Sequence, residues 1–336
     1  MDVQTLSFRE KFCYGVTDLS FSIAYTVQSF FLLIFITDIL TIPPALAGTL
    51  LLLTKAWDAL IDPIIGYLSD HTKSKWGRRR PFMLWFSLPF GLAFILLWSL
   101  PTVASPFLQT SLVLGALLVF ITFFSLLSVP YTSLAPEMTL DYDERTRLNG
   151  YRMFFSIIGG LLAAVLPSGL LGMAPTLQAG YRLMGVCFGI WIGLLPLAAF
   201  FGTKERSMPA AESPTFLQGL RLVLQNRPFV LSLIMYLATW VAIDVISAVF
   251  LYYLKYWIGI TEENSNIIFG LIFISAALFL PFWVKFTARF GKKGAYFTGL
   301  GSLSLLMLSL FFLPAGISPL IYVIAVLAGI GVSAAH

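Results

Sequence analysis

The sequence predicts an all-α protein that crosses a membrane many times. Hydrophobic residues make up 58% of the 336 residues and charged residues only 11%, and the mean hydropathy is +0.88. A soluble domain carries about a quarter charged residues and could not bury this much apolar surface. In addition, the charged residues cluster between long apolar runs. The composition therefore argues against a soluble enzyme, a nucleic-acid binder and a secreted disulfide scaffold.

Ten apolar runs, separated by charged residues, prolines and glycines, approach the length of about 20 residues that a membrane helix needs. The first follows the charged residues Arg9, Glu10 and Lys11 and is too long for a signal-peptide core. In chain order, the predicted spans are 12–38, 45–68, 82–100, 107–136, 149–171, 182–201, 229–256, 265–288, 294–313 and 318–336.

The basic residues predict the orientation of these spans. Of the 21 Lys and Arg residues, 18 lie at the N-terminus, in the connections that follow spans 2, 4, 6 and 8, or at the adjoining helix ends. Positive charge concentrates on the cytoplasmic side of membrane proteins, so we expect a cytoplasmic N-terminus, in the inner membrane if the source is bacterial. The same bias accounts for the pI near 9.2 without a nucleic-acid partner.

A polar stretch at 202–228 divides a six-span bundle, 1–201, from a partial bundle of about four spans, 229–336. We read 202–228 as a cytoplasmic linker. This plan resembles the major facilitator superfamily, whose halves are parallel repeats. Because the chain ends at His336 inside an apolar run, we expect roughly two further helices to be missing.

The second span contains Lys55, Asp58 and Asp62, which share one 60° face of a helix. Each ionisable residue costs about 2.5–3.5 kcal/mol at the bilayer centre on insertion scales, so such residues indicate function. If Lys55 neutralises one acid, the net charge of −1 could be cancelled by Na⁺, Li⁺ or a proton. We therefore predict a coupling-cation site at Asp58 and Asp62. The alternative is a buried Lys–Asp pair that holds this helix to a neighbour.

Polar stripes on three further spans are predicted to converge on one cavity between the halves. Each serine or threonine taken singly is better explained by a bond to its own helix or by helix packing. The acids Asp18 and Asp244 therefore carry more of the argument. The stripes are Asp18, Ser22, Tyr25 and Ser29; Ser125, Ser128 and Thr132; and Tyr236, Trp240, Asp244 and Ser247.

The connections carry charge patterns and the spans carry glycine patterns. In the connection after the second span, Asp70, Gly77, Arg78 and Arg79 are predicted to form a conformational gate, although ordinary positive-inside charge would also explain them. The mixed charges from Glu137 to Arg147 are most simply a solvated face. We expect close helix packing at Gly159, Gly160, Gly185, Gly189 and Gly193.

Four segments resemble the glycoside–pentoside–hexuronide:cation symporter family, which includes melibiose permease. They are Tyr14–Asp18 (YGVTD), Lys55–Asp70 (KAWDALIDPIIGYLSD), Val129–Arg152 (VPYTSLAPEMTLDYDERTRLNGYR) and Tyr252–Gly259 (YYLKYWIG). The resemblance runs from residue 12 to the end of the chain. It implies alternating access around a central sugar site driven by Na⁺, Li⁺ or H⁺, with the two cation carboxylates at Asp58 and Asp62 and the neighbouring basic residue at Lys55.

Several sugar-site positions depart from this pattern. Relative to melibiose permease, Ser22 and Ser128 replace acids, Thr132 replaces a tryptophan, and the arginine of the fifth span falls on Met153, beside Arg152. The cation pair therefore carries over and the galactoside site does not. With fewer carboxylates around the cation, H⁺ is at least as good a candidate as Na⁺.

We therefore expect a secondary active transporter that couples H⁺ or Na⁺ to a sugar, glycoside or uronate. The alternative is a transporter of lysolipids or other amphiphiles, because lysophospholipid transporters share the same segments. Proposed cavity residues are Asp18, Ser22, Tyr25, Lys55, Ser128, Thr132, Arg152, Trp240 and Asp244. With two histidines, two cysteines and no catalytic or metal-ligand cluster, we expect no enzyme activity, no cofactor beyond the coupling ion, and a monomer in the bilayer.

Overall fold

The computed structural model describes residues 5–206, 225–260, 265–312 and 319–333. Within these ranges every regular element is a helix, which confirms the predicted fold class. Most of the predicted linker, together with the ends of the last span, lies outside the described residues. Eight helices are long and apolar enough to cross a membrane, and the two shorter apolar helices, Ile267–Phe279 and Leu320–Ser333, complete the ten predicted spans.

The first six predicted spans form the N-terminal bundle. Its helices are α1 (Phe8–Ile34), which continues as the π-helix η1 (Phe35–Ile39), α2 (Pro44–His71), α3 (Arg80–Trp98), α4 (Pro106–Met138), α5 (Tyr142–Gly172), α6 (Leu177–Leu194) and α7 (Pro196–Gly202). Local sequence explains where they begin. Ser7 and Glu10 form a capping box at α1, and the Asp141 side chain accepts a hydrogen bond from the Glu144 amide at α5.

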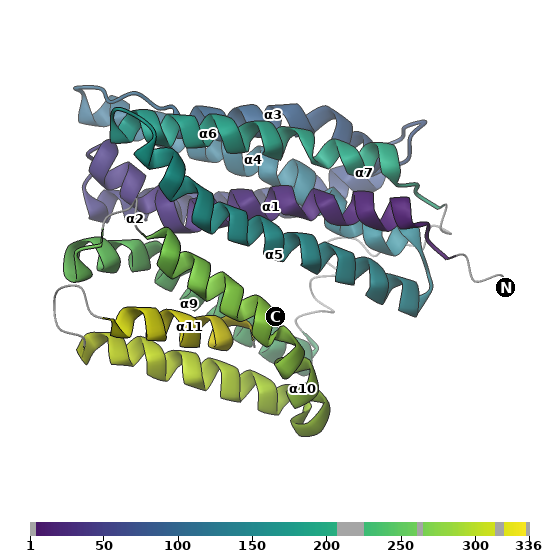
Figure 1. Ribbon diagram of the computed structural model, residues 1–336. Coiled ribbons are helices and arrows are strands. Elements are labelled where there is room, and N and C mark those ends of the chain that lie inside the picture. Colours follow the sequence, from purple (N-terminus) through teal and green to yellow (C-terminus); the bar gives the residue numbers. More distant parts are fainter. Residues whose placement is uncertain (1–4, 207–224, 261–264, 313–318, 334–336) are drawn as a thin grey trace.

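The second bundle contains α9 (Arg227–Tyr252), which continues as the π-helix η2 (Tyr253–Ile258), α10 (Asn266–Ser309), the short η4 (Leu310–Phe312) and α11 (Leu320–Ser333). Gly291 has φ 77° and ψ 162° and interrupts α10. The two parts of α10 run in opposite directions (Figure 1), so they correspond to two predicted spans.

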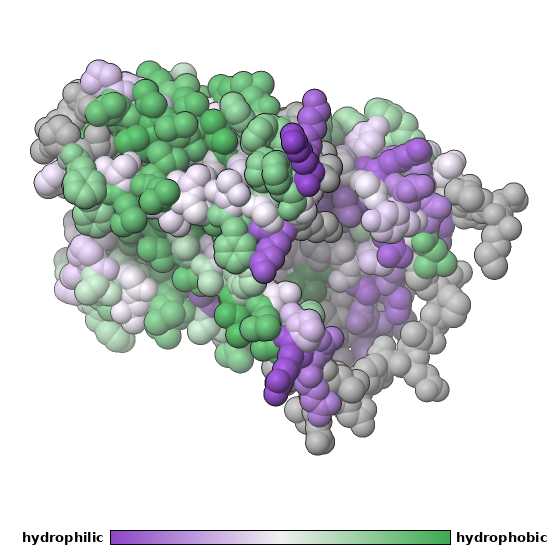
Figure 2. All heavy atoms as spheres, turned by 90° about the horizontal axis from the view of Figure 1, so that it is seen from below, coloured by the Kyte–Doolittle hydropathy of each residue, from purple (hydrophilic) through white to green (hydrophobic). Residues whose placement is uncertain are grey.

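The two bundles form two layers (Figure 1). In the N-terminal layer α1 packs against α5, and α3 packs against α4 and α6; between the layers α1 contacts α9 and α5 contacts α10. Figure 2 shows hydrophilic residues gathered toward the end that carries the N-terminus, while hydrophobic residues dominate the other half of that face. We call these the N-terminal end and the far end, the latter carrying η1 and η2.

Close packing of α3 on α6 depends on glycine. A Cβ at Gly91 would lie 2.4 Å from the Gly189 carbonyl oxygen and 2.8 Å from the Gly193 Cα. A Cβ at Gly185 would lie 2.5 Å from the Cβ of Trp98. The predicted packing role is therefore confirmed for Gly185 and Gly189, where an added Cβ would come within 3.0 Å of α3, whereas at Gly193 it would lie 3.3 Å from the Gly91 Cα.

Candidate functional site

A cavity of about 380 Å³ lies between the two layers. It is lined by α1, α4 and α5 from one bundle and by α9, α10 and α11 from the other. Its wall is mainly apolar, with polar groups gathered on α1, α5 and α9. The polar lining residues are Asp18, Ser22, Tyr25, Thr26, Ser29, Arg152, Ser156, Trp240, Ser247 and Ser333.

An ion pair forms the charged part of this cavity. Arg152 on α5 donates from Nε to Asp18 Oδ1 on α1 at 2.9 Å. Asp18 is 6% exposed, so its charge depends on Arg152 rather than on water. One turn along α1, the Ser22 hydroxyl donates to the Ser156 carbonyl at 2.6 Å. The structure thus brings three of the predicted cavity residues together on two adjacent helices.

Asp244 joins the two bundles. Its Oδ2 accepts from Lys55 Nζ of α2 at 3.0 Å, and its Oδ1 accepts from the Tyr25 hydroxyl of α1. Trp240, one turn earlier on α9, packs edge-on against Tyr25 with ring centroids 6.2 Å apart. Lys55 was expected to neutralise one of the α2 acids. Instead its ammonium pairs with Asp244 across the interface.

Asp58 and Asp62 are consequently left without an ion pair among the described residues. Ser125 of α4 donates to Asp58 Oδ1 at 3.0 Å. Asp62 Oδ1 is buried and has no hydrogen-bond partner in the described part of the chain. The site therefore has two formal negative charges rather than the predicted one, and a buried oxygen that a cation or proton would satisfy. The described residues contain no cluster of three or more His, Cys, Asp or Glu that could hold a metal.

Two predicted cavity residues on α4 lie elsewhere. Thr132 is exposed, and its hydroxyl bonds the carbonyls of Ser128 and Val129 on its own helix. Neither Ser128 nor Thr132 is among the residues that line the cavity. The Thr132 hydroxyl thus makes the local bond that serine and threonine commonly form in helices.

The predicted gate residues form a network at the N-terminal end. Arg79 donates to Asp70 at 2.7 Å and to Glu137 at 2.6 Å, and Arg78 donates to Glu137 at 2.8 Å. These residues all belong to the N-terminal bundle. The expectation of a solvated face from Glu137 to Arg147 is wrong for Glu137 and for Glu144, because both are buried against basic partners.

Glu205 was missed by the sequence reasoning. Its carboxylate accepts from the backbone amides of Arg78, Arg79 and Arg80 at 2.6–2.8 Å. Gly77, with φ 104°, makes the turn that presents these amides, and a Cβ there would lie 2.3 Å from Glu205 Oε2. The only sequence signal was an acid just beyond the sixth span.

Contacts between the bundles at the far end were also missed. Asp38 of η1 pairs with Lys255 of η2 and accepts from the Tyr256 hydroxyl at 2.8 Å. Thr37 and Tyr252 share a hydrogen bond beside this pair. The available signal was Lys255, one of two basic residues that the predicted topology would place on the outer side.

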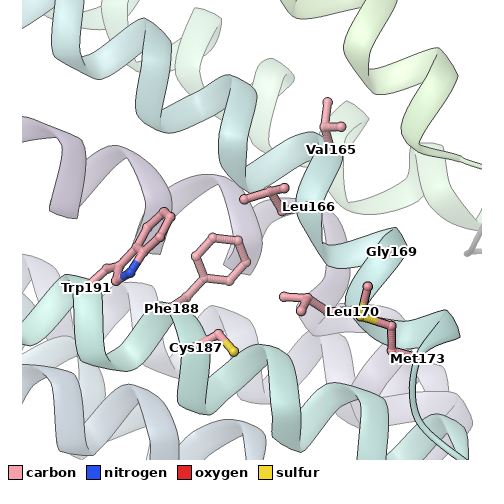
Figure 3. A pocket seen from close by; sticks show the side chains of 8 residues that line it. All are labelled: Val165, Leu166, Gly169, Leu170, Met173, Cys187, Phe188 and Trp191. Carbon is pink, nitrogen blue, oxygen red and sulfur yellow. The ribbon is translucent and has the colours of Figure 1, made fainter.

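A second cavity, of about 430 Å³, lies between α5 and α6 (Figure 3). Leu166 comes from α5, Met173 directly follows α5, and Trp191 comes from α6; all three are exposed. Its lining side chains are apolar apart from the Cys187 thiol and the indole N–H of Trp191, and none of them is charged.

Comparison with known proteins agrees with this architecture. The family model described as MFS/sugar transport protein matches residues 13–336. An uncharacterised symporter of Synechocystis sp. is 29% identical over all of the chain and 77% of the relative's length. The sodium-dependent lysophosphatidylcholine symporter 1 of Mus musculus is 29% identical, covering 99% of the chain and 68% of the relative.

Two further similarities concern a sugar transporter and the fold. The isoprimeverose transporter of Lactiplantibacillus pentosus is 26% identical over 87% of the chain and 61% of its own length. The crystal structure of a bacterial homologue of the human lysosomal transporter Spinster covers 98% of the chain and 74% of its own, with a TM-score of 0.65 at 14% identity. The latter likeness shows the fold alone.

Proposed function

The chain belongs to the MFS/sugar transport protein family of the major facilitator superfamily, and on that premise we propose that it is a cation-coupled symporter of a sugar, glycoside or uronate. The family and the fold are those of multi-pass membrane transporters. The observation that carries the coupling proposal is the α2 acid pair. Asp58 and Asp62 form no ion pair in the described chain, and one Asp62 oxygen is buried without a donor.

The coupling ion would be H⁺ or Na⁺, bound at Asp58 and Asp62. Two carboxylates one helical turn apart repel each other, and a bound cation or proton relieves that repulsion. With the ion bound, α2 carries less uncompensated charge and can move against its neighbours during alternating access. Asp58 is held by Ser125 of α4, so the ion would join α2 to α4.

The solute would bind in the cavity between the bundles. Arg152 and Asp18 offer one donor group and one acceptor group side by side, which suits a hydroxyl-rich or carboxylate-bearing solute. Tyr25 and Trp240 add aromatic faces on which a sugar ring could lie. Both bundles contribute to this lining, so binding would depend on their relative position.

A second candidate, transport of a lysolipid or other amphiphile, has a specific observation in its favour. The cavity wall contains Phe21, Phe30, Phe124, Phe273 and Ile272, an apolar surface larger than a small sugar requires. Relatives named as lysophosphatidylcholine symporters support the same reading. An amphiphile would place its polar group at Arg152 and Asp18 and its chain along the phenylalanines.

The test is transport by the purified chain in proteoliposomes. Sugars, uronates and lysolipids are added in turn while internal pH and Na⁺ are followed. We expect ion movement that depends on one solute class and is abolished in Asp62→Asn, with Asp143→Asn, an exposed carboxylate of α5, as the matched control. Solute entry without ion movement would leave a facilitator and refute coupling.

A further inference from the structure

Lys55 is placed between two sets of acids. On α2 it precedes Asp58 by three residues and Asp62 by seven, on the same helix face. Its ammonium nevertheless lies 3.0 Å from Asp244 of α9, in the other bundle. A lysine side chain is a flexible four-carbon stem with a compact charge, so it can reach one set of acids or the other. A single ammonium cannot neutralise both.

Asp244 is held as a fixed acceptor for this ammonium. Its second oxygen accepts from Tyr25 of α1, and Tyr25 in turn packs against Trp240 of α9. The carboxylate therefore stays in place only while α1, α2 and α9 are close together. If α9 moves away from α1 and α2, Lys55 loses Asp244 as a partner.

With Lys55 on Asp244, neither acid of α2 has an ion-pair partner among the described residues. Asp58 receives one hydroxyl donor, from Ser125, and Asp62 Oδ1 has no donor within the described ranges. A cation would find the strongest attraction in this arrangement. With Lys55 turned onto the acids, the site would already contain a positive charge.

We propose that Lys55 is an internal competitor of the coupling cation, and that its transfer between Asp244 and the Asp58–Asp62 pair links ion binding to the contact between the bundles. This inference rests on the proposed cation site. An ion on Asp58 and Asp62 displaces Lys55 to Asp244, which favours the contact of α2 and α1 with α9. By linkage, that contact raises the affinity for the ion by the same factor.

The test is a double-mutant cycle on ion affinity in the purified chain. Thermal stability is measured against NaCl at fixed pH and against pH at fixed NaCl, with choline chloride holding the ionic strength. The ion concentration at the midpoint of the response measures the affinity for the ion, because a ligand that binds the native state stabilises that state by mass action. The variants are D244N, K55Q and the double variant D244N/K55Q. D143N is the charge control.

We expect D244N to lower the affinity for the ion roughly tenfold. One neighbouring charge alters the ionisation of a carboxylate on this scale. The reason is that Lys55, released from Asp244, occupies the acids. In the K55Q background, D244N should change the midpoint by less than about twofold, since no competitor remains. Lys55 has 61% of its side chain exposed, so its release should leave the fold intact.

The outcomes separate the inference from the proposed function. If D244N lowers the affinity for the ion equally with and without K55Q, or does not change that affinity, Lys55 is not a competitor and the inference is overturned. If the unmodified chain responds to neither ion, or responds as well in D58N and D62N, the cation site itself is refuted and this inference with it.

Discussion

At the scale of single residues, Ser125 is the group on which the cation site depends most directly after the acids. Its hydroxyl is the one donor to Asp58 among the described residues, and it joins α4 to α2. We expect Ser125→Ala to tighten H⁺ binding at Asp58 several-fold, because the hydroxyl donates to the charged carboxylate and so opposes the proton, although water replaces part of the lost bond. Ser128→Ala, one turn away on α4, is the control. Both variants are compared by the ion concentration that gives half of the thermal stabilisation. Equal effects of the two substitutions would contradict the role of Ser125.

The pair Asp18–Arg152 makes a prediction about stability as well as solute binding. Arg152→Met leaves Asp18 buried and without its cation, which costs about 3 kcal/mol by analogy with other buried pairs. The double variant D18N/R152M should recover part of this loss, because the lone charge is gone. Unfolding of the purified chain in detergent measures the difference. A double variant less stable than R152M would show that Arg152 does not serve to neutralise Asp18.

How far the sequence predicts the site depends on the kind of partner each residue has. Spacing alone shows which charged residues share one face of a helix, as Asp58 and Asp62 do. Spacing cannot identify partners on other helices, so Lys55 was assigned to its nearest acids and its ion pair with Asp244 was missed. Glu205 shows the same limit, because the amides it accepts from lie more than 120 residues away in the sequence.

At the scale of elements, the contact of α3 with α6 can be tested by adding one methyl group. Gly91→Ala would place a Cβ 2.4 Å from a backbone oxygen of α6. We expect a loss of about 1–3 kcal/mol, typical of overpacking. Gly115→Ala on α4 is the control, since nothing lies within 4 Å of its added Cβ. Thermal unfolding compares the two variants, and equal stability would mean that α3 and α6 can move apart at no cost in stability.

The connection between α2 and α3 is ordered by a side chain outside it. Glu205→Ala removes the acceptor for three consecutive backbone amides and should loosen the segment around Gly77. Because Lys73 and Lys75 lie in this connection, we expect faster trypsin cleavage there than in the unmodified chain. Glu205→Gln, which keeps one acceptor oxygen, should lie between the two. Unchanged cleavage in Glu205→Ala would contradict this account.

Helix boundaries show what local sequence does and does not specify. Pro44, Pro106 and Pro228 mark helix starts that were predicted to within a few residues, because proline fits the first turn of a helix. The sixth predicted span, however, is divided between α6 and α7, with Pro196 at the first position of α7. The apolar run continues through this break, so hydropathy alone could not reveal it.

At the scale of the whole molecule, the ion pair Asp38–Lys255 holds the two bundles together at the far end. Asp38→Lys should repel Lys255 and reduce solute accumulation several-fold, because like charges at this distance oppose closure. The charge exchange D38K/K255D should restore part of the activity. Transport in proteoliposomes measures both variants. If the exchange is no better than D38K, the pair does not act through its charges.

The two-bundle plan was predictable because it depends on long-range properties that survive many substitutions: apolar length, basic loops and one polar linker. Which residues pair across the two bundles was not predictable. Pairs such as Tyr25–Asp244 and Thr37–Tyr252 join different helices, so spacing along one helix could not identify the partners.

The first helix of each bundle ends in a π-helix, and this affects the direction of the side chains at the far end. A π-helical segment holds one residue more than the α-helix it replaces, as the bond from the Leu40 amide to the Phe35 carbonyl shows. The extra residue is absorbed within the π-helical turn, so the residues on either side keep their faces. If the same residues were α-helical, those beyond them would be turned by up to about 100° around the axis. The same holds for Lys255 in Tyr253–Ile258. The two π-helical turns therefore contribute to the direction in which Asp38 and Lys255 face, and with it to the contact between the bundles.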